Sequence, residues 1–338
     1  MRALGPGGPL YTATSSVRTV YSAASPWMLK FSLPVRITNS VRVNRRHELE
    51  AGVTMAKLIG ALGPALHTGL RFILDPAYMT ITLPGRAESG FEVILRENPF
   101  TAGRDAGVMT VAALTADPLP GQSSRLETLV RRVAQMGDQS PAMAAQGWFR
   151  AYLACALVPL VQLYDAHGIA LEAHQQNSLL EVSAGLPQAF YYRDNQGYYL
   201  SERYRAYLRR YIPESDNIRA LYYDEAEINK RFSYYLIVNQ IFSVIARLDK
   251  DGLSPEAGLL AELRACLEAL LPQLRGAGQG FVTDLLARPT LGAKFNLTTR
   301  LFDIDELDVA DEGALYAHFP NPLAPPTGAS VAPYALPS

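Results

Sequence analysis

The sequence predicts an α+β fold in which an antiparallel β-sheet domain precedes a mainly helical domain. Hydrophobic residues make up 49% of the 338 residues and charged residues 19%, which predicts a compact body with a large core. Short β-favouring runs fill the first third of the chain, whereas apolar residues recur at helical spacing over much of the remainder. The segment 117–122, DPLPGQ, lies where the period changes and is the expected boundary.

The elements follow from these patterns in chain order. Gly, Pro, Asp and Asn punctuate six predicted β runs, at 11–21, 28–38, 70–74, 78–83, 91–96 and 108–114. One helix, about 48–62, interrupts them. Later helices are expected over 123–136, 142–166, 201–211, 224–248 and 255–275, with a β segment at 170–199. We expect domains over 1–115 and 116–323, then a Pro-rich tail over 324–338.

Charge is balanced over the whole chain, with 31 basic and 32 acidic residues and a net charge of −1. Nucleic acid and anionic membranes are therefore not expected as partners, and any anion site must be a local cluster of cations. The longest apolar run, 151–164, is too short to span a bilayer. The first ten residues carry no apolar leader, and Cys155 and Cys266 show no metal-binding spacing, which favours a reducing cytoplasm.

A polar strand pair near the start of the chain is the first candidate site. Residues 29–38, LKFSLPVRIT, alternate, so the following are expected to face the core: Leu29, Phe31, Leu33, Val35 and Ile37. Lys30 and Thr38 lie on the opposite, polar face. Arg18, Lys30 and Arg42 are spaced 12 residues apart, so paired strands could place these cations around a polyanion such as a triphosphate. The alternative is an ordinary solvated sheet face.

The segment 167–177, HGIALEAHQQN, is the second candidate site. Extended backbone would put Glu172, His174 and Gln176 on one side, with Asn177 adjacent. Asp194 follows in YYRDNQG, which predicts a hairpin turn. Because Mg²⁺ prefers oxygen ligands, Glu172 and Asp194 are the better metal candidates, and His174 suits phosphate or a substrate carboxylate. The alternative is a hydrogen-bonded turn without a ligand.

Two other features are weaker. Lys294 and Arg300, in KFNLTTRL, form either a site for a substrate carboxylate or a solvated face. An aromatic run at helical spacing predicts core packing: Tyr222, Tyr223, Phe232, Tyr234 and Tyr235. No Gly-rich nucleotide fingerprint occurs, so ATP would have to bind through side chains on a sheet.

Five separated motifs carry a family resemblance: TSSVRT, LKFSLPVRITNSVR, HGIALEAHQQN, YYRDNQG and KFNLTTRL. In this order and spacing, the chain resembles the IucA/IucC family of NRPS-independent siderophore synthetases over roughly 12–323. The resemblance implies a cupped-hand fold with ATP between fingers and palm. The fingers would be 1–115 and the palm 116–323, and the family's N-terminal thumb is expected to be missing.

The resemblance also implies roles for individual residues. Those that would bind the nucleotide and its phosphates are Ser16, Arg18, Thr19, Lys30 and Arg42. Those that would hold Mg²⁺ are Glu172, Gln176 and Asp194. His174 and Asn177 would contact phosphate or the carboxylate substrate, and Thr38 and Arg42 would face that carboxylate.

The activity that the resemblance implies is ATP-dependent ligation in siderophore biosynthesis. A citrate-like carboxylate attacks the α-phosphate of ATP, and an amine or hydroxyl then displaces AMP. The strand LKFSLPVRITNSVR is more similar to members that use free citrate. A cytoplasmic homodimer is expected. The alternatives are a kinase-like phosphotransferase, although Ile169 stands where its catalytic Asp would be, and an inactive fragment that binds only nucleotide or a partner.

Overall fold

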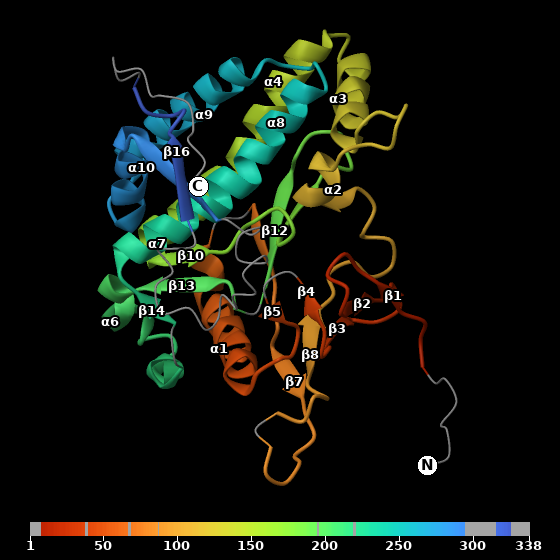
Figure 1. Cartoon of the computed structure of the whole chain (residues 1–338), viewed down its shortest axis with the longest axis vertical. Helices are drawn as coiled ribbons and strands as arrows, with labels where there is room; N and C mark the ends of the chain where they lie inside the picture. Colours follow the sequence, from red (N-terminus) through yellow and green to blue (C-terminus); the bar gives the residue numbers. More distant parts are fainter. Residues whose placement is uncertain are drawn as a thin grey trace, which may run out of the picture.

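The computed structural model describes residues 8–37, 40–66, 69–86, 88–194, 196–218, 221–294 and 316–325. Strands and helices are segregated as the sequence predicts, which confirms the α+β class. In Figure 1 a five-stranded sheet lies at the lower right and a layer of long helices at the top, with further short strands between them.

The strands in the first third are short: β1 (Thr12–Ala13), β2 (Thr19–Tyr21), β3 (Trp27–Phe31), β4 (Arg36–Ile37), β5 (Ser40–Val41), β6 (Leu70–Ile73), β7 (Ala77–Met79), β8 (Val93–Glu97) and β9 (Val108–Thr110). The later strands are β10 (Ile169–Leu171), β11 (Ser178–Glu181), β12 (Ala189–Arg193), β13 (Tyr198–Ser201), β14 (Tyr222–Tyr223), β15 (Thr290–Lys294) and β16 (Tyr316–Pro320).

The α-helices are α1 (Arg46–Leu62), α2 (Val111–Thr115), α3 (Arg125–Met136), α4 (Pro141–Tyr152), α5 (Val158–His167), α6 (Arg205–Leu208), α7 (Glu225–Phe232), α8 (Phe242–Lys250), α9 (Glu256–Leu270) and α10 (Ala277–Ala287). Two π-helical segments, Leu153–Leu157 and Ser233–Ile241, join α4 to α5 and α7 to α8. Gly168 closes α5 in the left-handed conformation, with φ of 65°.

Three main sheets organise the strands. The five-stranded sheet has the order β1–β2–β3–β8–β7 and is antiparallel throughout. A four-stranded sheet, β6–β12–β11–β9, takes two strands from each part of the chain, and β6 runs parallel to β12. A three-stranded sheet is β10–β13–β14. The division near residue 115 stays a prediction, and the four-stranded sheet crosses it.

One continuous helix, Pro141–His167, forms the centre of the core. It is 27 residues long with a mean hydropathy of 1.2, long and apolar enough to cross a membrane, but 67% of that apolar window is buried inside the molecule. Trp148, Phe149 and Tyr164 on this helix are fully buried. Buried core helices of water-soluble proteins have this composition, so the apolar character is explained by packing.

Several predicted elements differ from the observed ones. The run 108–114 is a three-residue strand followed by α2, because Thr110 caps that helix by accepting a hydrogen bond from the Ala113 amide. The expected helix over 201–211 shrinks to α6 and a 3₁₀ turn. Helix α10 was not predicted. Asp194 does not lie in a hairpin, because β12 and β13 belong to different sheets.

The strand predicted over 28–38 faces the opposite way from the prediction. In β3, Met28 and Lys30 are buried, whereas Phe31 is 39% exposed. Val35, also expected in the core, is 48% exposed. The cause is electrostatic: a network of ion pairs and hydrogen bonds lies on the inner side and holds Lys30 there.

Candidate nucleotide and metal site

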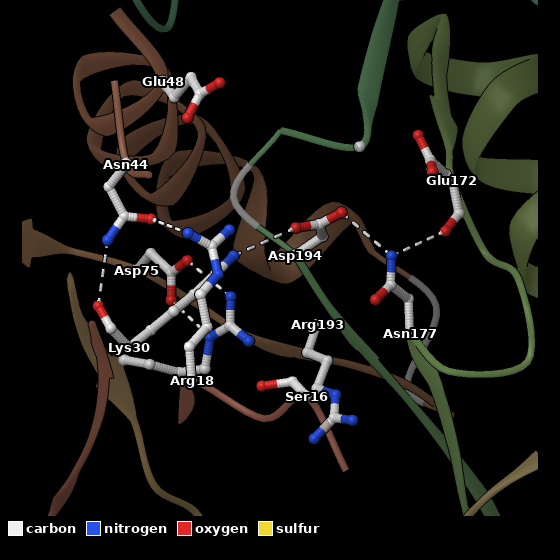
Figure 2. A network of polar contacts seen from close by, with 12 residues as sticks. Ser16, Arg18, Lys30, Asn44, Glu48, Asp75, Glu172, Asn177, Arg193 and Asp194 are labelled. Atoms are coloured by element: carbon white, nitrogen blue, oxygen red, sulfur yellow. Dashed lines mark hydrogen bonds and ion pairs between the residues drawn. The ribbon is translucent and has the colours of Figure 1, made fainter. Parts of the chain in front are cut away.

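Three segments far apart in the sequence meet beside the five-stranded sheet: strands β2 and β3, the loop 172–177 after β10, and the turn at Asp194 after β12. Figure 2 shows Arg18 and Lys30 pointing toward Asp194 from the sheet side, with Asn177 on its other side. The two candidate sites from the sequence therefore form one site.

Asp194 joins the two candidate sites. One carboxylate oxygen, Oδ1, lies 3.8 Å from Lys30 Nζ. The other, Oδ2, accepts a hydrogen bond of 3.0 Å from Asn177 Nδ2, which also donates to the Glu172 carbonyl at 3.2 Å. These contacts fix the Asp194 carboxylate between the sheet and the loop that carries Glu172.

Arg18 is held by groups that precede α1. Its Nη1 donates to the Arg42 carbonyl at 2.7 Å and to Asn44 Oδ1 at 2.8 Å. Asn44 is fully buried and donates through Nδ2 to the carbonyls of Lys30 and Glu92, both at 3.2 Å. Since a buried amide needs its partners, Asn44 sets the position of Arg18 relative to Lys30.

The charge around Lys30 is predominantly positive. Burial, then the nearby Arg96 cation, lowers the pKa of Lys30 to about 8. Burial, then Arg96, also lowers the pKa of Arg193 to about 10. Arg96 itself is neutralised by Asp75 through two bonds of 2.7 and 2.8 Å. Because the surroundings disfavour additional positive charge, an incoming polyanion would be stabilised here.

Glu172 lies on the loop side of the site. Tyr199 donates a 2.6 Å hydrogen bond to Glu172 Oε2. Burial, followed by the negative charge of Asp194, raises the pKa of Glu172 to about 7. The carboxyl group therefore binds a proton near neutral pH, unless a cation replaces that proton.

His174 lies beside Glu172 and beneath an aromatic side chain. Its Nε2 is 3.8 Å from Glu172 Oε1, and its ring centroid is 5.9 Å from that of Tyr235. Burial lowers the pKa of His174, so a neutral imidazole is favoured. Lys294 Nζ donates to the Tyr235 hydroxyl at 2.9 Å, which brings this predicted substrate cation to the same cluster.

The remaining predicted residues are placed less directly. Ser16 lies at the edge of the cluster in Figure 2, and Gln176 is exposed with its amide on the Ser15 carbonyl at 3.2 Å. Arg42 directs its guanidinium to the Ile37 carbonyl at 2.9 Å. Thr19 is buried, and its hydroxyl has no hydrogen-bond partner among the described residues. Thr38 and Arg300 lie outside the described residues.

Four residues of the cluster were not predicted: Asn44, Arg193, Tyr199 and Tyr235. Asn44 and Arg193 adjoin the motifs TNSVRVN and YYRDNQG, so their position in the sequence was the available signal. Tyr235 was correctly expected to be buried, at 9% exposure, but its hydroxyl also faces the site. Helical periodicity reports burial of a ring and carries no information on where its hydroxyl points.

The residues fit a magnesium ion in their donor chemistry. Glu172 and Asp194 repel one another electrostatically, and a divalent cation between them would remove that cost. Gly197 leaves room for the pair, since a Cβ there would lie 2.6 Å from Glu172 Cβ and 2.9 Å from Asp194 Oδ2. No group of three His, Cys, Asp or Glu side chains forms a metal cage in the described ranges, but nucleotide-bound Mg²⁺ needs only one or two carboxylates plus phosphate oxygens.

Two family models match the chain. Residues 1–116 match the IucA / IucC family, and residues 146–309 match the family described as ferric iron reductase FhuF-like transporter. The first match contains the Arg18–Lys30 side of the site, and the second contains Glu172, His174 and Asp194.

Similar proteins share this sequence over nearly its whole length. The spermidine-citrate ligase of Bacillus anthracis is 42% identical over 95% of this chain and 53% of the relative. The rhizobactin siderophore biosynthesis protein RhbC of Rhizobium meliloti is 38% identical over 94% of this chain and 55% of the relative. The chain thus spans about half the length of the curated relatives it matches. The phosphotransferase alternative gains no support from these names.

The fold also matches a solved structure with bound ATP. The ATP-bound aerobactin synthetase IucA from Klebsiella pneumoniae superposes with a TM-score of 0.83 at 29% identity, over 93% of this chain and 55% of that chain. The motif order, the shared fold and the sequence identity agree, and the chain belongs to the IucA/IucC family.

Proposed function

We propose that this chain carries the ATP-binding part of a siderophore synthetase, an AMP-forming acid–amine ligase. The observation that carries the proposal is the buried cation cluster of Arg18 and Lys30, which faces Asp194 and Asn177 across the site. Relatives named as citrate ligases supply the substrate class: a citrate-like carboxylate and an amine or hydroxyl.

The residues divide the chemistry between them. A carboxylate approaches the α-phosphate of ATP, and both are anions, so their repulsion must be screened. Arg18 and Lys30 bind the phosphates and offset that charge, with Ser16 and Thr19 at the same edge of the sheet. Arg42 and His174 stabilise the reacting carboxylate and phosphate. Binding in one geometry then lowers the barrier, because the two reactants no longer have to meet by diffusion.

The other predicted contacts complete the site. Thr38, Lys294 and Arg300 bind the substrate carboxylate groups, and Asn177 and Gln176 orient the nucleotide. Glu172, Gln176 and Asp194 would hold Mg²⁺, which supplies positive charge to the phosphates when bound. Removal of the proton from the Glu172 carboxyl group is then coupled to metal binding.

The remaining assignments follow the family. The protein acts in the cytoplasm in siderophore biosynthesis and forms a homodimer. Residues 1–115 act as fingers, 116–323 as palm and 324–338 as a tail. The activity belongs to the whole synthetase, so half-length chains and full-length chains are to be compared.

The leaving group of ATP tests the proposal. The chain, alone and joined to the remainder of a relative, is incubated with ATP, Mg²⁺, citrate and spermidine. AMP and pyrophosphate are expected, and both should require citrate. ADP and inorganic phosphate instead would show phosphotransfer or hydrolysis and would contradict adenylation. Binding of ATP to the chain alone, measured by calorimetry, checks the nucleotide site separately from turnover.

A further inference from the structure

The outer face of the five-stranded sheet is apolar in every strand. The ladder places one row directly side by side across the five strands: Ala13, Val20, Leu29, Leu95 and Ala77. The next row is Phe31, Val93 and Met79. The third pair is Trp27 and Glu97, so one charged side chain occurs in these three rows. We call these ten residues the outer face.

The outer face is open to solvent in this chain. Trp27 is 38% exposed, Phe31 39% and Met79 52%. Phe91 and Ile81, which continue the patch beyond the ends of β8 and β7, are 64% and 55% exposed. Adjacent strands are about 4.8 Å apart and alternate residues about 6.8 Å, so the three rows cover roughly 19 by 14 Å. Contiguous apolar patches of a few hundred Å² mark interaction sites.

The two sides of the sheet have reversed polarity. The inner side carries Thr19, Lys30 and Arg96, all buried and committed to the nucleotide site. An antiparallel sheet with one solvated side normally turns its polar residues to water. Here the polar side is used by the site, so the apolar side requires a second layer.

We propose that the outer face is an interface for the polypeptide that corresponds to the part of the relatives outside this chain. The occupant follows from the lengths: this chain is matched over 95% of its residues, yet it accounts for only 53% of the spermidine-citrate ligase and 55% of the solved aerobactin synthetase. The partner presents apolar side chains, since Glu97 is the single charge in the three rows. This inference is independent of the catalytic proposal, because binding and accessibility are its readouts.

Hydroxyl-radical footprinting tests the interface, because methionine and tryptophan oxidise readily where they are exposed. Two proteins are compared: this chain alone, and a chimaera in which this chain replaces the matched region of the Bacillus anthracis ligase. We expect oxidation of Met79 and Trp27 to fall at least fivefold in the chimaera. Met136 and Met143, 70% and 61% exposed on α3 and α4, serve as controls and should keep their rates.

The outcomes separate the possible occupants. Equal oxidation of Met79 in both proteins, or equal protection of both control methionines, overturns the proposal. A second copy is the occupant instead if the isolated chain has the mass of a dimer by light scattering and if Met79 protection is lost on dilution.

A substitution gives an independent readout. Phe31→Lys should lower the unfolding temperature of the chimaera by several degrees and leave that of the isolated chain unchanged, since Phe31 meets solvent only in the latter. Met143→Lys, on α4, should change neither protein. A Phe31→Lys chimaera as stable as its parent overturns the proposal.

Discussion

Lys30 Nζ lies 3.8 Å from Asp194 Oδ1, and this ion pair links β3 of the five-stranded sheet to the turn that follows β12. Both side chains are largely buried, at 10% and 20% exposure. Burial lowers the pKa of Lys30 to about 8 even though Asp194 faces it. The ammonium group is therefore incompletely compensated, and a phosphate chain supplies the charge that the pair lacks.

The first prediction concerns the pH dependence of ATP binding. Lys30 is charged below pH about 8 and loses its proton above that value. Bound phosphates raise the pKa of Lys30, so binding takes up a proton above pH 8. ATP affinity should be constant from pH 6.5 to 7.5 and should fall up to tenfold per unit above pH 8, as measured by calorimetry.

Lys30→Arg is the matched variant for this prediction, because arginine stays charged over the whole range. Its ATP affinity should show no decline between pH 8 and 9.5. A decline as steep as that of the parent would assign the titration to another group.

Arg18→Ala should weaken ATP binding at least tenfold. The substitution removes a phosphate-facing cation, and it leaves Asn44 Oδ1 without its donor, which costs about 1–3 kcal/mol of stability. Calorimetry measures the affinity and urea unfolding measures the stability. Arg46→Ala, an exposed cation paired with Glu50 on α1, should change neither by much. An unchanged ATP affinity in folded Arg18→Ala protein would assign Arg18 a structural role only.

Glu172→Gln should stabilise the protein above neutral pH. The folded state raises the pKa of Glu172 from 4.5 to about 7, so it binds the proton more tightly than the unfolded state does. Stability from this group is full below pH 4.5 and is lost as pH rises to about 7. The variant should therefore exceed the parent by about 1–3 kcal/mol at pH 8 and by little at pH 5, in urea unfolding.

Mg²⁺ and a control variant complete that prediction. Magnesium with ATP should raise the melting temperature of the parent more at pH 8 than at pH 6, because the metal replaces the Glu172 proton, and Glu172→Gln should lose this difference. Glu181→Gln, a carboxylate of similar exposure at 26%, should gain no stability at pH 8. A Glu172→Gln protein no more stable than the parent at pH 8 would contradict the assignment.

Gly197→Ala should disturb the pair of carboxylates. The added Cβ would lie 2.5 Å from the Tyr192 hydroxyl, 2.6 Å from Glu172 Cβ and 2.9 Å from Asp194 Oδ2. Something must shift, at a cost of about 1–3 kcal/mol, and Mg²⁺-dependent stabilisation by ATP should weaken. Gly147→Ala, in α4 with no atom within 4 Å of its Cβ position, should be neutral or stabilising. Equal behaviour of the two variants would show that Gly197 has no such role.

The sequence predicted element types and the two polar motifs, because periodicity and residue chemistry are local properties. It could not predict the side of β3 that faces inward. Alternation separates Lys30 from Phe31, but only the contact with Asp194, 164 positions later, decides which of them is buried. Long-range electrostatics therefore overrode the hydrophobic pattern in this strand.

The same limit explains the residues that the sequence analysis missed. Tyr199 and Asn44 have no unusual spacing, and they join the site because a strand of one sheet and a loop before α1 happen to meet it. The α6 region shows the opposite error. Its helical pattern is interrupted because Tyr204 and Tyr207 hydrogen-bond to Asp165 and His167 at the end of α5, which are tertiary contacts that no local pattern reports.

The last prediction concerns His174. His174→Ala should lower citrate-dependent pyrophosphate release about 10²–10³-fold, the typical loss when one positioned donor to developing charge is removed. ATP affinity should change only a few-fold, because Arg18 and Lys30 keep their positions on the sheet. The experiment uses the chain joined to the remainder of a relative, with Arg46→Ala as the matched control. Should pyrophosphate release stay within a few-fold of the parent while stability falls, His174 would be a turn residue, since its Nδ1 accepts a hydrogen bond from the Gln176 amide at 3.2 Å.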